Sequence, residues 1–145
     1  MQVTLENTSA SYRIHAYENG QITIAIPKQL ETPPEGHQDN SNKLSMWRET
    51  LHHSFIIAPQ GLLRNWGADT FDELRGQHFA QLLQYEPEVV VFGSGKTLLR
   101  PSPVMLAPLI DAGIGVEIMD TGAACRTYNI LMNDERRVAA ALMMI

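Results

Sequence analysis

The sequence predicts an α/β domain in which a parallel βαβ core follows an N-terminal β-hairpin. In the second half, apolar β-branched runs alternate with segments that carry helix caps, an order typical of parallel strands joined by right-handed crossovers. Near the start, an Asn-Gly pair lies between two short apolar runs and predicts a hairpin. The length of 145 residues is close to the commonest domain size, so we expect one domain over residues 1–145.

The first quarter of the chain holds the hairpin and then a polar loop. Residues 11–16 and 21–26 are the predicted strands, and Asn19-Gly20 is predicted to form a type I′ turn with positive φ at both residues. Residues 31–43 contain prolines, a glycine and polar side chains, with almost no apolar anchors. We expect this segment to be a mobile loop without a single conformation.

The segment after the loop is harder to assign. Leu44, Trp47 and Leu51 can share one apolar face, and their spacing fits either a helix or an extended segment. Residues 53–59, HSFIIAP, contain an apolar run that ends in proline and predict a strand, and residues 62–66 predict an irregular or extended continuation.

A helix is predicted between this strand and the next one. Thr70 and Glu73 have the spacing of a capping box, in which each side chain bonds the backbone N–H of the other residue. The positions that follow at near-helical spacing are Phe71, Leu74, His78, Leu82 and Tyr85. We expect one helix that ends before Pro87, followed by a strand over residues 88–92 that is buried on both faces.

The rest of the chain continues the strand–helix alternation. Ser102 and Pro103 predict the start of a helix that runs to Ala112, with a kink or break at Pro108 and a stop at Gly113. The next expected elements are a buried strand over residues 115–119 and a helix over residues 123–132. The last segment, residues 138–145, fits a helix by composition and a strand by its place in the order, and we favour a strand.

Composition excludes several classes of function. The net charge of −5 and the scattered basic residues argue against a nucleic-acid partner, because phosphate binding depends on Lys and Arg. Neither a secretory signal nor an apolar run near the ~20 residues of a membrane span is present. The single cysteine, Cys125, excludes an intramolecular disulfide and fits a reducing compartment. We therefore expect a cytoplasmic protein.

Residues 93–97, Gly-Ser-Gly-Lys-Thr, look like the end of a phosphate-binding P-loop. That motif also needs a glycine five positions before Gly95, where this chain has Val90 inside the predicted strand. It needs a helix that starts at Lys96, whereas the helix cap comes only at Ser102. The sequence therefore favours a glycine turn at the carboxyl end of a strand over a nucleotide site.

Ligands of open α/β sheets bind beyond the carboxyl ends of the parallel strands, where two of these turns are expected to meet. The candidate ligand-binding residues are Gly93, Ser94, Gly95, Lys96, Asp120, Thr121, Cys125 and Arg126. Lys96 and Arg100 can bind a small anion or pair with Asp120, and pairing is favoured because semi-buried carboxylates need a partner.

No complete catalytic or metal-binding set is recognisable. Cys125 lies in the first turn of a predicted helix beside Arg126, which can lower a thiol pKa, but no histidine can be placed near it as a base. A buried structural cysteine is therefore favoured over a nucleophile. His52-His53 has no second ligand pair at metal spacing, so neither a metal nor a cofactor is expected.

Three segments of the second half resemble one known family. They are PEVVVFGSGKTLLRPSP, AGIGVEIMDTGAACRTYNIL and NDERRVAAAL, and SFIIAPQGLLRNW matches less specifically. They resemble the domain-of-unknown-function 498 proteins, also called Mth-938-like, which include a mitochondrial complex I assembly factor. The positions that match the family pattern are Gly93, Gly95, Met119, Asp120, Thr121, Ala124, Tyr128, Asn129 and Arg137.

The resemblance implies a three-layer domain around a central mixed sheet, with a late strand antiparallel to the rest, and it favours strand for residues 138–145. It also implies that Asp120 and Thr121 cap the following helix, and that Tyr128 and Asn129 tie this helix to neighbouring loops. It supplies no reaction, and the assembly role of the mitochondrial relatives implies a protein partner.

Two hypotheses of function follow. The first is a non-catalytic interaction or assembly module, for which we expect an exposed apolar or aromatic patch that includes Trp47 and Trp66. The second is a small-molecule or anion-binding protein, or an enzyme of unknown reaction, with its site at the carboxyl ends of the parallel strands. The first is favoured because no complete catalytic set is present.

Overall fold

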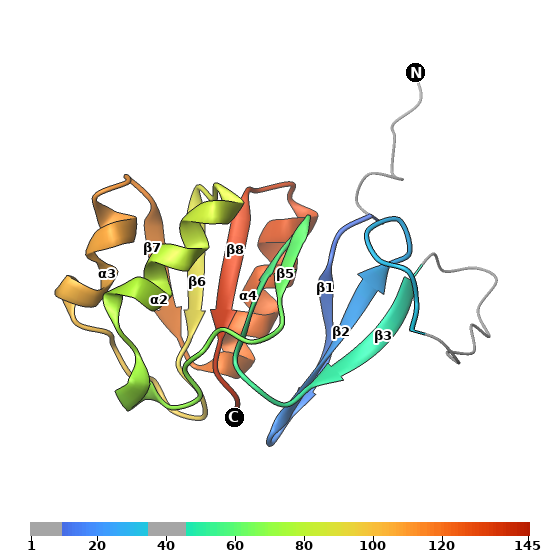
Figure 1. Ribbon diagram of the computed structural model, residues 1–145, viewed down its shortest axis with the longest axis horizontal. Coiled ribbons are helices and arrows are strands. Elements are labelled where there is room, and N and C mark those ends of the chain that lie inside the picture. Colours follow the sequence, from blue (N-terminus) through green and yellow to red (C-terminus); the bar gives the residue numbers. More distant parts are fainter. Residues whose placement is uncertain (1–9, 35–45) are drawn as a thin grey trace.

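The computed structural model describes residues 10–34 and 46–145, which form a mixed α/β fold with two sheets (Figure 1). Most of the predicted loop over residues 31–43, and Leu44 after it, lie outside the described residues. No helix in the described part of the chain is both long and apolar enough to cross a membrane.

The first sheet is antiparallel and contains three strands, so the predicted hairpin is confirmed and extended by one strand. The strands are β1 (Arg13–Glu18), β2 (Gln21–Pro27) and β3 (Met46–Leu51), in that order. Trp47 and Leu51 lie on β3, so this segment is extended and not helical. The type I′ turn is wrong, because Gly20 has a φ of 78° whereas Asn19 is outside the left-handed region. One glycine is enough to close this two-residue turn.

The second sheet contains five strands in the order β5-β4-β8-β6-β7. The strands are β4 (Phe55–Ala58), β5 (Gly61–Leu63), β6 (Val89–Gly93), β7 (Gly115–Met119) and β8 (Val138–Leu142). β6 pairs in parallel with both β7 and β8, and β4 pairs antiparallel with β5 and β8. The last segment is thus a strand, as favoured above.

The expected antiparallel late strand is wrong. β8 runs parallel to β6, and the strand that opposes the other four is β4. The reason is the connection, because a helix joins β7 to β8 and such a crossover returns the chain in its original direction. The expectation of a buried strand at Gly115–Met119 is also wrong, since β7 forms one edge of the sheet and is partly exposed.

The single helix predicted after Thr70 is broken into three short pieces. They are η1 (Phe71–Glu73), α2 (Gly76–Ala80) and η2 (Gln81–Tyr85). The break falls at Leu74, whose ψ of 140° is extended and whose side chain is fully buried. The Glu73 carboxylate accepts hydrogen bonds from the backbone N–H and the hydroxyl of Thr70, but the Glu73 N–H donates to the Thr70 carbonyl instead of the hydroxyl. Burial of Leu74 therefore overrides the helical spacing.

The two later helices begin at or within two residues of their predicted starts. α3 (Pro103–Ile110) is capped by Ser102, whose hydroxyl accepts a hydrogen bond from the Met105 N–H, and it continues through Pro108. α4 (Thr121–Asn133) begins two residues earlier than predicted, with Asp120 as its cap.

Successive residues of the central strands face two different hydrophobic cores. Val90 and Phe92 of β6 pack on the side of α2 and α3, whereas Val89 and Val91 pack on the side of α4. Figure 1 shows these helices on the two faces of the sheet. The three-stranded sheet packs into the core on the α4 side through the fully buried side chains of Ile22, Ile24 and Ile26. Helices thus pack on both faces of the five-stranded sheet, and the small sheet packs into the same core as α4.

Both tryptophans belong to these cores, so the expected exposed patch around them is wrong. Trp66 is 1% exposed, its indole N–H donates to the His78 carbonyl at 2.8 Å, and its ring packs edge-on against Phe79 and Phe92. Trp47 is 6% exposed. Large aromatic side chains at these positions are packing residues.

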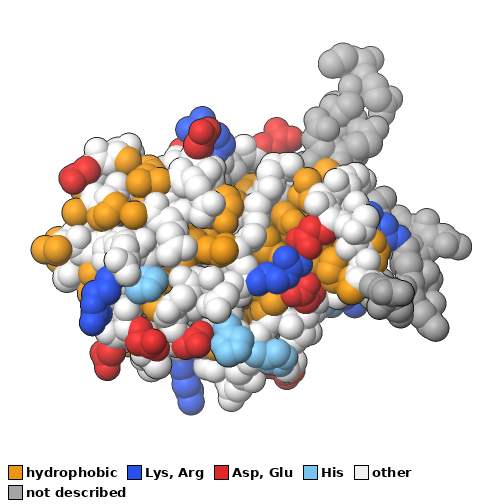
Figure 2. Space-filling view, viewed as in Figure 1, with side chains coloured by type: hydrophobic (Ala, Val, Ile, Leu, Met, Phe, Trp, Pro, Cys, Tyr) orange, Lys and Arg blue, Asp and Glu red, His pale blue; other side chains and the backbone are white. Residues whose placement is uncertain are grey.

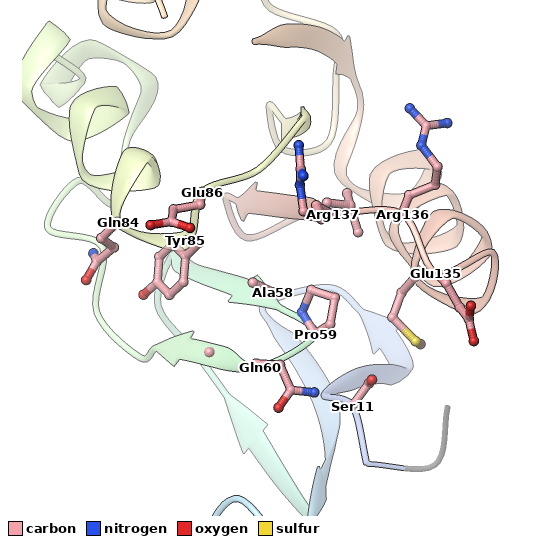
Figure 3. Close-up of a pocket in the computed structure, with 13 residues that line it drawn as sticks. Ser11, Ala58, Pro59, Gln60, Gln84, Tyr85, Glu86, Glu135, Arg136 and Arg137 are labelled. Carbon is pink, nitrogen blue, oxygen red and sulfur yellow. The ribbon is translucent and has the colours of Figure 1, made fainter. Parts of the chain in front are cut away.

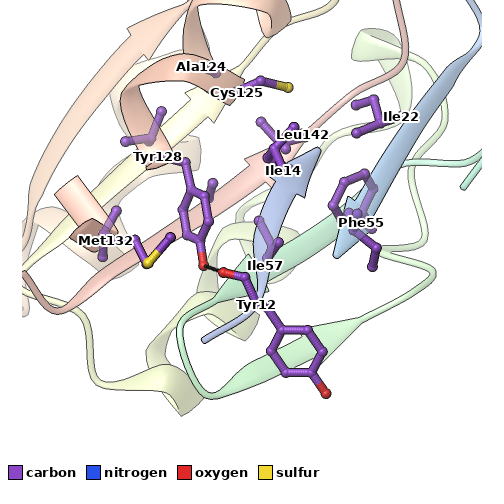
Figure 4. Packing of buried hydrophobic residues seen from close by; sticks show 14 of the residues in the cluster. Tyr12, Ile14, Ile22, Phe55, Ile57, Ala124, Cys125, Tyr128, Met132 and Leu142 are labelled. Carbon is purple, nitrogen blue, oxygen red and sulfur yellow. Dashed lines mark hydrogen bonds between the residues drawn. The ribbon is translucent and has the colours of Figure 1, made fainter. Parts of the chain in front are cut away.

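Two adjacent side chains of α4 hold the three-stranded sheet in place. The Tyr128 hydroxyl donates to the Tyr12 carbonyl at 2.7 Å (Figure 4). The Asn129 amide accepts from the Ile14 N–H at 2.9 Å and donates to the Ile14 carbonyl at 2.8 Å. These residues do tie α4 to its surroundings, but their partners are β1 and the residue before it, not loops.

Two strand glycines offer a matched test of this packing. A Cβ atom at Gly93 would lie 2.9–3.0 Å from Thr121, Ala124 and Leu142, whereas one at Gly115 would meet only the Glu88 carbonyl at 4.0 Å. We expect Gly93→Ala to lower the free energy of unfolding by about 1–3 kcal/mol through overpacking, and Gly115→Ala to change it by less than about 0.5 kcal/mol. Urea unfolding measures both, and equal effects of the two substitutions would contradict the packing described here.

Candidate functional site

The predicted site residues come from two segments that lie side by side at the carboxyl ends of β6 and β7. The Ser94 N–H donates to the Met119 carbonyl at 2.9 Å, and the Thr121 N–H donates to the Gly95 carbonyl at 2.9 Å. These backbone bonds extend the pairing of β6 and β7 into the turns that follow each strand. The structure thus brings together Gly93–Gly95 and Asp120–Thr121.

Thr121 is the centre of this end of the sheet. Its side chain is fully buried, and its hydroxyl donates to the Met143 carbonyl at 2.7 Å while accepting from the Gly95 N–H at 2.8 Å. The Met143 N–H in turn donates to the Gly93 carbonyl at 3.0 Å. One hydroxyl therefore joins the start of α4 to the ends of β6 and β8. The capping role expected for Thr121 is wrong, because Asp120 alone caps the helix.

Ser94 shapes the loop that follows β6. It is 5% exposed, and its hydroxyl donates to the Thr97 carbonyl at 2.6 Å and accepts from the Leu99 N–H at 2.9 Å. A Gly95 φ of 105° lets the chain turn away from the strand at this point. The Ser94 hydroxyl is thus engaged in folding the loop.

The charged residues of the predicted site do not pair with one another. The Asp120 carboxylate accepts from the Ala123 N–H at 2.9 Å. The favoured pairing of Lys96 or Arg100 with Asp120 is wrong, since no ion pair in the described part of the chain includes any of the three. Lys96 and Arg100 are exposed. The partner of the Asp120 carboxylate is thus a backbone N–H in the first turn of α4, and not a cation.

Cys125 and Arg126 point to different surroundings although they are adjacent. Cys125 is 1% exposed within the core, and burial raises the pKa of its thiol to about 12 although Arg126 acts in the opposite direction. The Arg126 guanidinium is exposed and donates to the Tyr17 hydroxyl, with its Cζ 6.0 Å from the centre of the Tyr17 ring. The favoured structural role of the cysteine agrees with this geometry.

The arrangement at the carboxyl ends of the strands is consequently a closed network. Its buried hydroxyls and amides satisfy one another, and the exposed residues of the predicted site are Lys96 and Arg126. Among residues 10–34 and 46–145, no three histidine, cysteine or acidic side chains lie close enough to hold a metal ion. A ligand site at Gly93–Lys96 and Asp120–Arg126 remains a prediction.

Sequence reasoning missed a pocket of about 570 Å³ at the opposite end of the same strands (Figure 3). Three chain segments line it: the turn between β4 and β5, the end of η2, and the connection from α4 to β8. Their residues are Ala58, Pro59, Gln60, Gly61, Gln84, Tyr85, Glu86, Met132, Glu135, Arg136, Arg137 and Val138, and Ser11 completes the lining. No functional motif marks these residues, and among them only Arg137 matches the family pattern.

Comparison with known proteins shows relatives over most of the chain. The family described as "Protein of unknown function (DUF498/DUF598)" matches residues 38–143. The "NADH dehydrogenase [ubiquinone] 1 alpha subcomplex assembly factor 3" of Bos taurus is 33% identical over 89 residues, which cover 60% of this chain and 48% of that protein. The "13 kDa major membrane protein" of Francisella tularensis is 28% identical over 95 residues, covering 66% and 77% respectively. This chain spans about half the length of the bovine relative.

Solved structures share the fold over nearly the whole chain. A crystal structure from Bordetella parapertussis has a TM-score of 0.73 and 30% identity, with 94% of this chain and 98% of that chain covered. The solution structure of a Bordetella pertussis protein described as a "Mth938-like domain" has a TM-score of 0.65 and 27% identity, with 99% and 92% covered.

The buried thiol predicts a loss of stability at alkaline pH. The Cys125 pKa rises from 9.0 to about 12 on folding, so above pH 9 the unfolded chain releases a proton that the native state retains. The free energy of unfolding should therefore fall by up to about 1.4 kcal/mol per pH unit between pH 9 and 12 from this group. Urea unfolding of the wild type and Cys125→Ala at pH 8, 9 and 10 measures the slope. Equal slopes in the two proteins would show that Cys125 is not held as a neutral thiol.

Proposed function

Because this chain belongs to the DUF498/DUF598 family and is similar to proteins named as assembly factors of NADH dehydrogenase, we propose that it is a non-catalytic protein-interaction or assembly module. One structural observation carries this proposal. Large apolar side chains are exposed to solvent on the loop after β6, whose backbone is hydrogen-bonded to the buried Ser94 hydroxyl. The relatives' names supply the kind of partner, which for this chain is a protein.

The apolar side chains belong to the loop after β6 and to the first turn of α3. Leu98 is 50% exposed, Leu99 is 41% exposed and Val104 is 81% exposed, and we call these three residues the α3 surface. Figure 2 shows hydrophobic side chains over the α3 end of the molecule, at the left of the view. Single exposed apolar residues are common, but several within seven positions of the chain are typical of an interaction site.

The loop is pre-shaped for binding. The Ser94 hydroxyl bonds the backbone of Thr97 and of Leu99, and Pro101 is buried. Ser102 and Pro103 then fix the start of α3. A partner that binds here would not have to order the loop, and ordering costs free energy in most associations. In this proposal, the glycine-serine turn that resembles a P-loop shapes the interaction loop.

The alternative function, a ligand site or unknown enzyme at the carboxyl ends of the strands, has less support. It would need Ser94, Thr121 and Asp120 to be available to a ligand, and each is engaged in hydrogen bonds within the protein. Cys125 would have to reach solvent, and it is buried. The cytoplasmic location and the absence of a nucleic-acid partner remain predictions.

Substitution of the α3 surface tests the proposal. We expect Val104→Glu and Leu98→Glu to reduce the amount of co-purifying partner at least tenfold, because a carboxylate buried in an apolar interface is strongly disfavoured. Ile130→Glu is the matched control, since Ile130 is 60% exposed on α4. Tagged proteins expressed in the source organism are captured after mild crosslinking and quantified by mass spectrometry.

Urea unfolding accompanies the capture experiment, and all three variants should keep the wild-type free energy of unfolding within about 0.5 kcal/mol. Proteins that are captured equally by the wild type and by Val104→Glu would place the interaction elsewhere. If the wild type enriches no protein over an untagged control sample, the interaction role itself would be contradicted.

A further inference from the structure

The pocket at the amino ends of β6 and β8 is distinct from both the α3 surface and the predicted carboxyl-end site. Its volume of about 570 Å³ lies within the ~300–1,000 Å³ typical of small-molecule sites. Its floor is apolar and nearly inaccessible, with Ala58 4%, Met132 3% and Val138 1% exposed. Tyr85 adds an aromatic wall, and its ring packs so closely over Gly61 that a Cβ there would lie 2.5 Å from the ring.

Ser11 adds a polar side chain to the lining of the pocket. The residue is 7% exposed, and its hydroxyl can donate or accept a hydrogen bond.

Arg137 is fixed at its backbone and free at its guanidinium. The Arg137 N–H donates to the Glu88 carboxylate at 3.2 Å, and the Arg137 carbonyl accepts from the Glu88 N–H at 2.7 Å. Its neighbour Arg136 takes the ion pair with Glu88 at 2.7 Å. The Arg137 guanidinium itself has no hydrogen bond or ion pair within the part of the chain that the structure describes. A planar guanidinium of this kind is suited to bidentate binding of a carboxylate.

Two carboxylates at the rim limit the charge that a ligand can carry. Glu86 and Glu135 line the pocket on its two sides (Figure 3), and within the described residues neither forms an ion pair. Both have left-handed backbones, with φ of 49° and 61°, and they are the described non-glycine residues with positive φ. Glu86 ends η2 and Glu135 follows the end of α4, where left-handed residues commonly stop a helix, so both side chains are set at the rim by helix ends. A simple anion would meet repulsion here, whereas an ammonium group would be favoured.

We infer that this pocket binds a small zwitterion with an apolar body, of the α-amino acid type. Its carboxylate pairs with Arg137, its ammonium group faces one of the two rim carboxylates, and its apolar side chain lies on Ala58, Met132 and Val138. The Ser11 hydroxyl bonds a polar atom of the ligand. This site needs neither the α3 surface nor the turns at the carboxyl ends of the strands.

Titration of the ¹⁵N-labelled protein with three related probes tests the inference. L-Phenylalanine carries both charges, 3-phenylpropionate lacks the amine, and 2-phenylethylamine lacks the carboxylate. We expect saturable amide shifts with L-phenylalanine at Gly61, Glu86 and residues 135–138, and binding at least several-fold weaker for each singly charged probe. Arg137→Gln should weaken L-phenylalanine binding at least tenfold.

Arg100→Gln is the matched control, because Arg100 is an exposed arginine outside the pocket lining, and it should bind L-phenylalanine as the wild type does. Arg137 is itself exposed, so its substitution should leave the fold intact, which the spectrum of the variant reports. The inference is overturned if L-phenylalanine gives no saturable shifts, if the shifts lie outside the pocket, or if Arg137→Gln binds as tightly as Arg100→Gln. Equal affinity for 2-phenylethylamine would overturn the assigned carboxylate.

Discussion

The hydroxyl of Thr121 is the interaction on which the rest of this fold depends. It is fully buried, and it joins the Gly95 N–H to the Met143 carbonyl, so that the turn after β6, the end of β8 and the start of α4 are held at one point. Removal of a hydroxyl that satisfies two buried backbone groups leaves both unpaired, which is costly in a low-dielectric interior. Thr121 and Gly95 of the predicted ligand site therefore take part in closing the sheet.

From this point the structure extends in two directions. Along α4, Tyr128 and Asn129 bond the backbone at Tyr12 and Ile14, which fixes the three-stranded sheet against the helix. Along the loop after β6, Ser94 holds the backbone that carries the apolar side chains of the α3 surface. The same hydrogen bonds that stabilise the domain thus set the geometry of the proposed interaction surface.

Local signals in the sequence predicted the second half well and the first half less so. The strand that ends at Gly93 and the helix start at Ser102-Pro103 could be predicted, because a β-branched run and a helix cap are patterns of residues close together in the sequence. Leu74 and Trp66 could not be assigned correctly, because their positions are set by burial against elements distant in sequence. The direction of β8 depends on a crossover, and the pocket around Arg137 depends on three separate segments, so no local pattern reports either.

The free energy of unfolding of Thr121→Val tests the central claim most directly, because valine keeps the shape of threonine and removes its hydroxyl. We predict a loss of about 2 kcal/mol or more. Thr121→Ser, which keeps the hydroxyl, should lose about 1 kcal/mol, and Thr127→Val, on the same helix, should lose less than about 0.5 kcal/mol. A Thr121→Val protein as stable as Thr127→Val would contradict the account, since the carboxyl end of the sheet would then not depend on this hydroxyl.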